Sequence, residues 1–183
     1  MPYSGLKLLD DLLFDNAPAR KRTVAAIFSS LVLVFLFVAG ILHWGLFLDF
    51  GEGSARLDWP ERLFWVSVLR DSITNLEIPY IVPHEFYFSD RFMGNLQAPF
   101  SPQILLTAVM SLSKFILVDT LLMYSLGFLG CLLIRKRYQL SLIPFTLLFL
   151  IFNFNGHITA HLAVGHQWNG YFLLPFFVLF ILE

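Results

Sequence analysis

The sequence predicts an all-α membrane protein, a polytopic helical bundle of about four transmembrane helices with a large external loop that carries an interfacial helix. Of its 183 residues, 57% are apolar and only 14% are charged, and the mean hydropathy is +0.72. The apolar residues gather in runs long enough to cross a bilayer, whereas residues 49–102 contain eight acidic side chains and no such run. Water-soluble globules and disordered chains do not have this composition.

The charge and cysteine counts exclude two further classes of protein. A formal net charge of −1 offers no excess of basic groups to a polyanion, so we expect no nucleic-acid partner. The single cysteine, Cys131, excludes a disulfide scaffold.

Residues 1–22 form an expected cytoplasmic segment, and residues 23–48 form the first expected transmembrane helix. Apolar residues at helical spacing between positions 4 and 15 are typical of a short amphipathic helix on the membrane surface. The following apolar run carries no charge and would be about 39 Å long as a helix, more than the roughly 30 Å of a hydrocarbon core. A signal peptide is the alternative, but its apolar region would hold only about 7 to 15 residues.

Residues 49–102 form a large loop outside the membrane, and part of it is expected to be helical. Asp58 and Pro60 are typical of a helix start, and apolar residues recur at helical spacing as far as Pro79. The recurring residues are Trp65, Leu69, Ile73 and Leu76. We expect this helix to lie along the membrane surface and irregular chain to follow it.

The remaining sequence predicts three further crossings of the membrane. Residues 103–134 are too long for one simple span and contain two charged side chains, so we divide them near Ser111. The expected elements are an interfacial or re-entrant helix (103–113), a second span (114–134), a cytoplasmic loop (135–139), a third span (140–156), an external turn with histidines (157–167) and a fourth span (168–183). The fourth span would be only about 22 Å long, so we expect it to be truncated and the chain to be a fragment.

Two basic clusters set the expected orientation. They flank span ends that face the same side of the membrane, and the positive-inside rule makes that side cytoplasmic. The clusters are Arg20, Lys21 and Arg22, and Arg135, Lys136 and Arg137. We therefore expect a multi-pass protein of a prokaryotic plasma membrane, with a cytoplasmic N-terminus and residues 49–102 outside the cell.

The acidic residues of the external loop are candidates for catalysis. Asp49 directly follows the first span, where a surrounding of low dielectric would strengthen its carboxylate as a base, so it is a candidate general base. A helix-end acid that faces water is the alternative. Asp58 is one of several further carboxylates of the same loop. The acids of the loop also have the chemistry to bind a divalent cation such as Mg²⁺ or Mn²⁺, but their spacing selects no particular set of metal ligands.

Histidines and arginines on the expected external side are candidates for substrate binding. His157 and His161 would share one helix face if their segment is helical, and His166 follows closely. This spacing suits zinc, but the acid of an H-E-x-x-H motif and a cysteine ligand are missing, so binding to a phosphate or lipid headgroup and structural packing are the favoured alternatives. Arg56 and Arg91 have guanidinium groups that fit phosphate oxygens, with salt bridges to the acids of the loop as the alternative.

Two further ionisable residues lie within the expected spans. Asp119 is in the second span, and we expect it to face another helix or a cavity, because a carboxylate does not face lipid. His43 is in the first span, and a packing role is the preferred interpretation.

Taken together, these features resemble the integral membrane glycosyltransferases of the GT-C fold, akin to protein O-mannosyltransferases and oligosaccharyltransferases. They include the basic cytoplasmic end, a first span that ends in Leu48 and Asp49, and the large first external loop. They also include the segment MGNLQAPFSP at 93–102 before the next apolar run, and the Gly-His pairs at 156–157 and 165–166. The resemblance covers about residues 20–182.

The resemblance implies transfer of a sugar from a polyprenyl-phosphate donor at the external membrane face. An acid near the end of the first span would activate or orient the acceptor hydroxyl, and Asp49 is the position that matches. The second acid of the family is open between Glu52 and Asp58. Such enzymes normally have about eight or more spans, so the resemblance implies the N-terminal part of one. Membrane lipid and the lipid-linked donor are the implied partners.

Two alternatives remain open. The external loop is rich in aromatic residues that are suited to contacts with other proteins, so the chain is alternatively a non-catalytic subunit or scaffold that binds further membrane subunits. A transporter is the third interpretation, but a transport pathway needs polar residues in several spans, and only Asp119 is a candidate.

Overall fold

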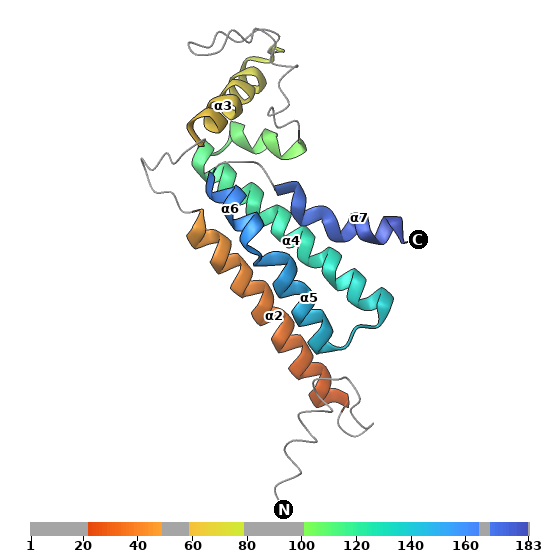
Figure 1. Ribbon diagram of the computed structural model, residues 1–183. Coiled ribbons are helices and arrows are strands. Elements are labelled where there is room, and N and C mark those ends of the chain that lie inside the picture. The colour runs from red at the N-terminus through yellow and green to blue at the C-terminus, as the bar shows by residue number, and fades with distance from the viewer. Residues whose placement is uncertain (1–21, 49–58, 79–100, 165–168, 183) are drawn as a thin grey trace, which may run out of the picture.

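The computed structural model describes residues 22–48, 59–78, 101–164 and 169–182, and all regular elements in these residues are helical (Figure 1). This confirms the all-α class. Three segments are long and apolar enough to cross a membrane, namely Thr23–Phe47, Leu112–Tyr138 and Leu142–Ala163. A fourth apolar helical segment, Asn169–Ile181, is shorter. The prediction of about four spans is therefore close, with three helices of full length among the described residues.

Helices α2 (Arg22–Phe47) and α4 (Leu112–Tyr138) pack side by side in opposite directions (Figure 1). Contacts at two levels show which residues of the two helices face each other. Near the start of α2, Ser29 Oγ accepts a hydrogen bond from Arg135 Nη2 at 2.9 Å. In the middle, Tyr124 Oη contacts the carbonyl oxygen of Phe37 at 3.1 Å. Between them and the neighbouring helices lies an aromatic core that includes Trp44 and Phe128.

Helices α5 (Leu142–Asn153) and α6 (Gly156–Val164) continue one another after a break at Phe154 and Asn155. Asn155 restarts the helix, because its Oδ1 accepts a hydrogen bond from the backbone N–H of Ile158 at 3.0 Å, the bond made by an N-cap residue. The sequence predicted a histidine-containing turn at 157–167 and left open whether it is helical, and residues 157–164 are helical in the structure. The cap keeps the chain helical through the histidine-containing segment.

The last elements, η4 (Asn169–Leu173) and α7 (Leu174–Ile181), lie along α4 (Figure 1). Two glycines of α4 permit this close approach. A Cβ at Gly127 would collide with the backbone carbonyl of Phe172, and a Cβ at Gly130 would lie 2.9 Å from Cβ of Pro175. Small residues at a helix interface are a usual device of membrane proteins, because packing rather than the hydrophobic effect holds their helices together.

Helix α3 (Trp59–Asn75) and the short η3 (Pro102–Ala108) form a second cluster with the start of α4. The helix predicted from Trp65, Leu69 and Ile73 is present, but its apolar face packs on protein. Buried side chains of α3 contact η3 and α4 in a cluster that also contains Leu48, the residue after α2. The other buried members of this cluster are Trp59, Trp65, Val66, Leu69, Ile104, Phe115 and Ile116.

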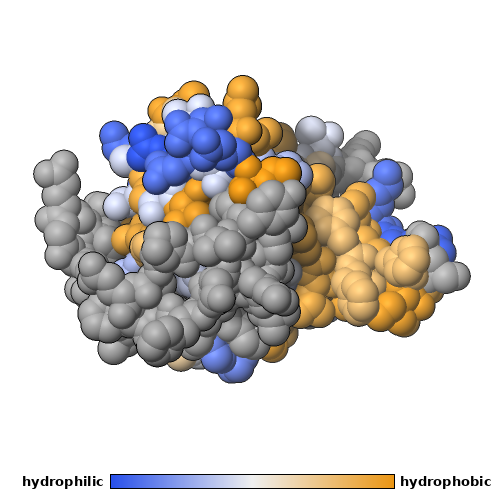
Figure 2. Space-filling view, turned by 90° about the horizontal axis from the view of Figure 1, so that it is seen from above, coloured by the Kyte–Doolittle hydropathy of each residue, from blue (hydrophilic) through white to orange (hydrophobic). Residues whose placement is uncertain are grey.

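The bundle has two chemically different ends. At one end, which we call the α3 end, α2 finishes, α4 begins, and α3 and α6 are located (Figure 1). Figure 2 looks onto this end and shows hydrophilic side chains over α3 and a hydrophobic surface over α7. At the opposite end, which we call the basic end, α2 begins and α4 finishes with Arg135, Lys136 and Arg137.

Candidate functional site

Of the residues predicted for catalysis or substrate binding, the structure describes His161. The other five, Asp49, Asp58, Arg56, Arg91 and His166, lie outside the described residues. Leu48, which precedes Asp49, is described and buried beside Phe115 and Ile116 of α4. The end of the first span is therefore anchored against the start of the second.

His161 and His157 lie one turn apart on α6, as expected for a helical segment. Their ring centroids are 4.3 Å apart and the rings meet edge to face. His157 is exposed and His161 is half-buried. Among the described residues, no three histidine, cysteine, aspartate or glutamate side chains gather as metal ligands would. The structure therefore provides a pair of imidazoles near the α3 end, and no metal centre within its described part.

A buried hydrogen-bonded group links α4 to η4. Asn169 Nδ2 donates to Asp119 Oδ2 at 2.7 Å, and Thr120 Oγ1 donates to Asn169 Oδ1 at 3.3 Å. Thr120 is fully buried, and Asp119 and Asn169 are 7% and 9% exposed. This confirms that Asp119 faces a neighbouring element. The short distance is typical of a hydrogen bond that a carboxylate strengthens.

The depth of this group follows from helix geometry. Asp119 is sixteen residues before Arg135 on α4, so the two are about 24 Å apart along the axis. If Arg135 marks one edge of a hydrocarbon core about 30 Å thick, Asp119 lies within the core but close to its opposite edge. A polar group at this depth is costly unless it is paired, and Asn169 pairs with Asp119 while its own amide oxygen accepts from Thr120.

A second set of polar atoms lies where α2 meets the end of α5. Within the part of the chain that the structure describes, His43 Nε2, Trp44 Nε1 and Asn153 Oδ1 are buried and make no hydrogen bond. The His43 ring is enclosed by aromatic rings, with centroid distances of 4.7 Å to Trp44 and 5.0 Å to Phe154. Buried polar atoms normally have a partner, so these atoms are suited to water or to polar groups of a ligand.

The packing role expected for His43 agrees with these ring contacts, but Asn153, Thr120 and Asn169 were not identified as site residues from the sequence. The available signal was an amide side chain within or beside an apolar run, at Asn153 and Asn169. The sequence alone does not pair Asn169 with Asp119, because fifty residues separate them and only the packing of η4 on α4 brings them together.

No protein-family model, no curated protein and no solved structure matches this chain.

Proposed function

We propose that this protein is a membrane glycosyltransferase that transfers a sugar from a polyprenyl-phosphate donor to an acceptor hydroxyl at the external face of the membrane. The main support is the distribution of buried polar side chains. Ser29 lies near the basic end, whereas the other five in the described residues lie toward the α3 end. These five are Thr107, Asp119, Thr120, Asn153 and Asn169.

This distribution suits an enzyme that works at one face of the bilayer. A sugar offers many hydroxyl groups, which carboxylate and amide side chains bind well, and a site in a bundle is built from such groups on facing elements. Asp119 and Asn169 provide a carboxylate and an amide on two neighbouring elements. The basic end carries the cations that mark a cytoplasmic face, so the α3 end is the external one in this proposal.

In the proposed reaction, Asp49 acts as the general base. It accepts the proton of the acceptor hydroxyl while the hydroxyl oxygen forms a bond to the anomeric carbon of the sugar. The bond from that carbon to the phosphate oxygen breaks, and polyprenyl phosphate leaves with the bonding electrons. Asp58 is proposed as the second acid. Arg56, Arg91, His161 and His166 are proposed to bind the donor phosphate.

Mg²⁺ or Mn²⁺ is assigned no step in this reaction. A divalent cation of this kind prefers carboxylate oxygens, and most acids of the loop lie outside the described residues. Within the described residues, Asp119 is hydrogen-bonded to an amide, and it is not part of a group of three or more histidine, cysteine, aspartate or glutamate side chains.

The proposal is tested by sugar transfer from a polyprenyl-phosphate donor, with the full-length protein reconstituted in liposomes. We expect Asp49→Asn to lower turnover by roughly 10²- to 10⁴-fold, the usual contribution of a general base. Asp71→Asn is the control, because Asp71 is an exposed carboxylate of α3 at the same end of the bundle. Undiminished turnover in Asp49→Asn would remove this residue from the mechanism. A stable larger assembly without any turnover would instead favour the non-catalytic subunit.

A further inference from the structure

A pocket opens at the basic end between α4 and α7. It has a volume of about 430 Å³ and is lined by Leu133, Lys136 and Arg137 of α4 and by Leu179 of α7. The two helices are in close contact at Gly130 and Pro175, one to two turns before the pocket. The pocket therefore lies beyond the point of tight packing, close to the edge of the membrane.

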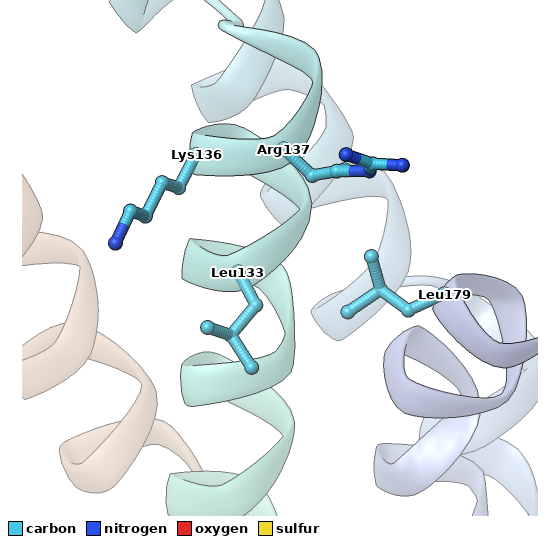
Figure 3. Close-up of a pocket in the computed structure, with 4 residues that line it drawn as sticks. All are labelled: Leu133, Lys136, Arg137 and Leu179. Carbon is cyan, nitrogen blue, oxygen red and sulfur yellow. The ribbon is translucent and has the colours of Figure 1, made fainter. Parts of the chain in front are cut away.

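The side chains of the pocket combine charge with an apolar wall. Figure 3 shows Arg137 reaching from α4 to the side of Leu179, while Lys136 leaves α4 on its other side. Within the described residues, neither cation forms an ion pair or a hydrogen bond with another side chain. Their neighbour Arg135 differs, because it is bound to Ser29 and to the carbonyl oxygen of Leu140.

We propose that this pocket binds the phosphate group of an anionic phospholipid from the leaflet at the basic end. The guanidinium of Arg137 is suited to hold phosphate oxygens in a bidentate manner, and Lys136, whose side chain leaves α4 on the other side, adds positive charge near the pocket. Leu133 and Leu179 provide the apolar wall that the glycerol and the first methylene groups of the lipid need. A soluble phosphate ester would use the cations but would gain nothing from the leucines.

The location also favours a lipid as the ligand. The pocket is at the end of a membrane-spanning helix, where basic side chains meet the headgroup region. Bound there, a lipid would fill the space between α4 and α7 and would stabilise their association. This inference does not depend on the proposed glycosyltransferase activity, which is assigned to the opposite end of the bundle.

Binding is tested with the purified, delipidated protein in detergent. Native mass spectrometry measures the affinity for added phosphatidylglycerol and for phosphatidylcholine, and we expect a clear preference for phosphatidylglycerol. Arg137→Gln should weaken phosphatidylglycerol binding about fivefold and Lys136→Gln should weaken it less. Lys114→Gln is the matched control, because Lys114 is an exposed cation at the other end of α4.

A second pair of variants tests the apolar wall without changing charge. Leu179→Trp should fill the pocket and reduce phosphatidylglycerol binding, whereas Phe180→Trp should not, because Phe180 is 79% exposed. Equal affinity for both lipids, or unchanged affinity in both Arg137→Gln and Leu179→Trp, would overturn the proposal. Displacement of the lipid by millimolar glycerol 3-phosphate would also overturn it and would identify a site for a soluble phosphate ester.

Discussion

The hydroxyl group of Tyr124 on α4 occupies the space beside α2 that a side chain at position 40 would need. Tyr124 is fully buried, and its hydroxyl is shared between the carbonyl oxygens of Leu36 at 3.2 Å and Phe37 at 3.1 Å. A Cβ at Gly40 would overlap this hydroxyl and the ring carbon that carries it. Gly40 is thus required by the close approach of a side chain from the neighbouring helix.

Gly40→Ala is therefore expected to destabilise the protein by about 1–3 kcal/mol, the usual cost of overpacking a well-filled core. Gly45→Ala is the matched control on the same helix, since a Cβ there meets nothing within 4 Å. We expect that control to be neutral or to gain up to about 1 kcal/mol, because alanine favours the helix more than glycine does. Unfolding in mixed micelles measures both. Equal stability of the two variants would contradict the described packing of α2 on α4.

Arg135 connects three elements at the basic end, and its removal should be costly. Its Nη2 donates to Ser29 of α2, its Nε donates to Leu140 after α4, and its guanidinium lies 5.5 Å from the ring centroid of Phe145 in α5. Arg135→Gln should lower the free energy of unfolding by about 1.5–3 kcal/mol, because bonds to a charged group are lost and acceptors are left without a donor.

Two neighbouring variants show whether this loss is specific to Arg135. Lys136→Gln and Arg137→Gln remove the same charge from exposed positions, so each should change stability by less than about 0.5 kcal/mol in lipid-free micelles. A comparable loss in all three variants would mean that the charge of the cluster matters and not the contacts of Arg135.

Gln139 ends α4 in the left-handed conformation, with φ 51° and ψ 40°. The backbone N–H of Leu140 bonds to the carbonyl oxygen of Arg135 at 3.0 Å, the bond of a Schellman-type helix end. Glycine adopts this conformation without the steric cost that a side chain brings, so Gln139→Gly should stabilise the protein by about 0.5–1 kcal/mol. A rise in the midpoint of thermal unfolding checks this. A fall in the midpoint would show that flexibility gained in the unfolded chain outweighs the relief of strain.

Much of the fold was predictable because a bilayer imposes simple requirements on sequence. The lengths of α2 and α4 follow from apolar runs that must cross the hydrocarbon core, and the burial of Asp119 follows from the cost of a carboxylate in lipid. The location of α3 was less predictable. Its apolar residues are suited to contact either the membrane surface or another part of the protein. Only the structure shows that Trp65 and Leu69 pack beside Phe115.

The candidate site was less predictable than the spans. The sequence indicated Asp119 as a candidate residue but did not indicate Asn169. The pairing of these two residues depends on how η4 lies against Gly127, and such long-range packing leaves no local pattern in the sequence. Whether residues 157–164 are helical was left open by the sequence for a different reason. Asn155 resembles a loop residue in the sequence, and its role as an N-cap depends on the bond to Ile158.

Asn169→Ala tests the buried polar group on which the proposed function depends. The substitution removes the amide that donates to Asp119 Oδ2 at 2.7 Å, and a buried carboxylate oxygen that loses its donor costs about 1–3 kcal/mol. Asn75→Ala is the control, because Asn75 is exposed at the end of α3. Unfolding in micelles measures the cost, and Asn169→Ala at wild-type stability would show that the pair contributes nothing to the fold.

Asp119→Asn then separates structure from function at the same position. The amide is nearly isosteric with the carboxylate and can still accept a hydrogen bond from Asn169, so the fold should lose less stability than in Asn169→Ala. If Asp119 binds sugar hydroxyls, loss of its charge should raise the KM for the lipid-linked donor severalfold with a smaller effect on kcat, since the residue is assigned to binding and not to proton transfer. Unchanged KM together with wild-type stability would assign Asp119 to packing alone. The site for the sugar would then have to be formed by the imidazoles of α6 and the loop residues around Asp49.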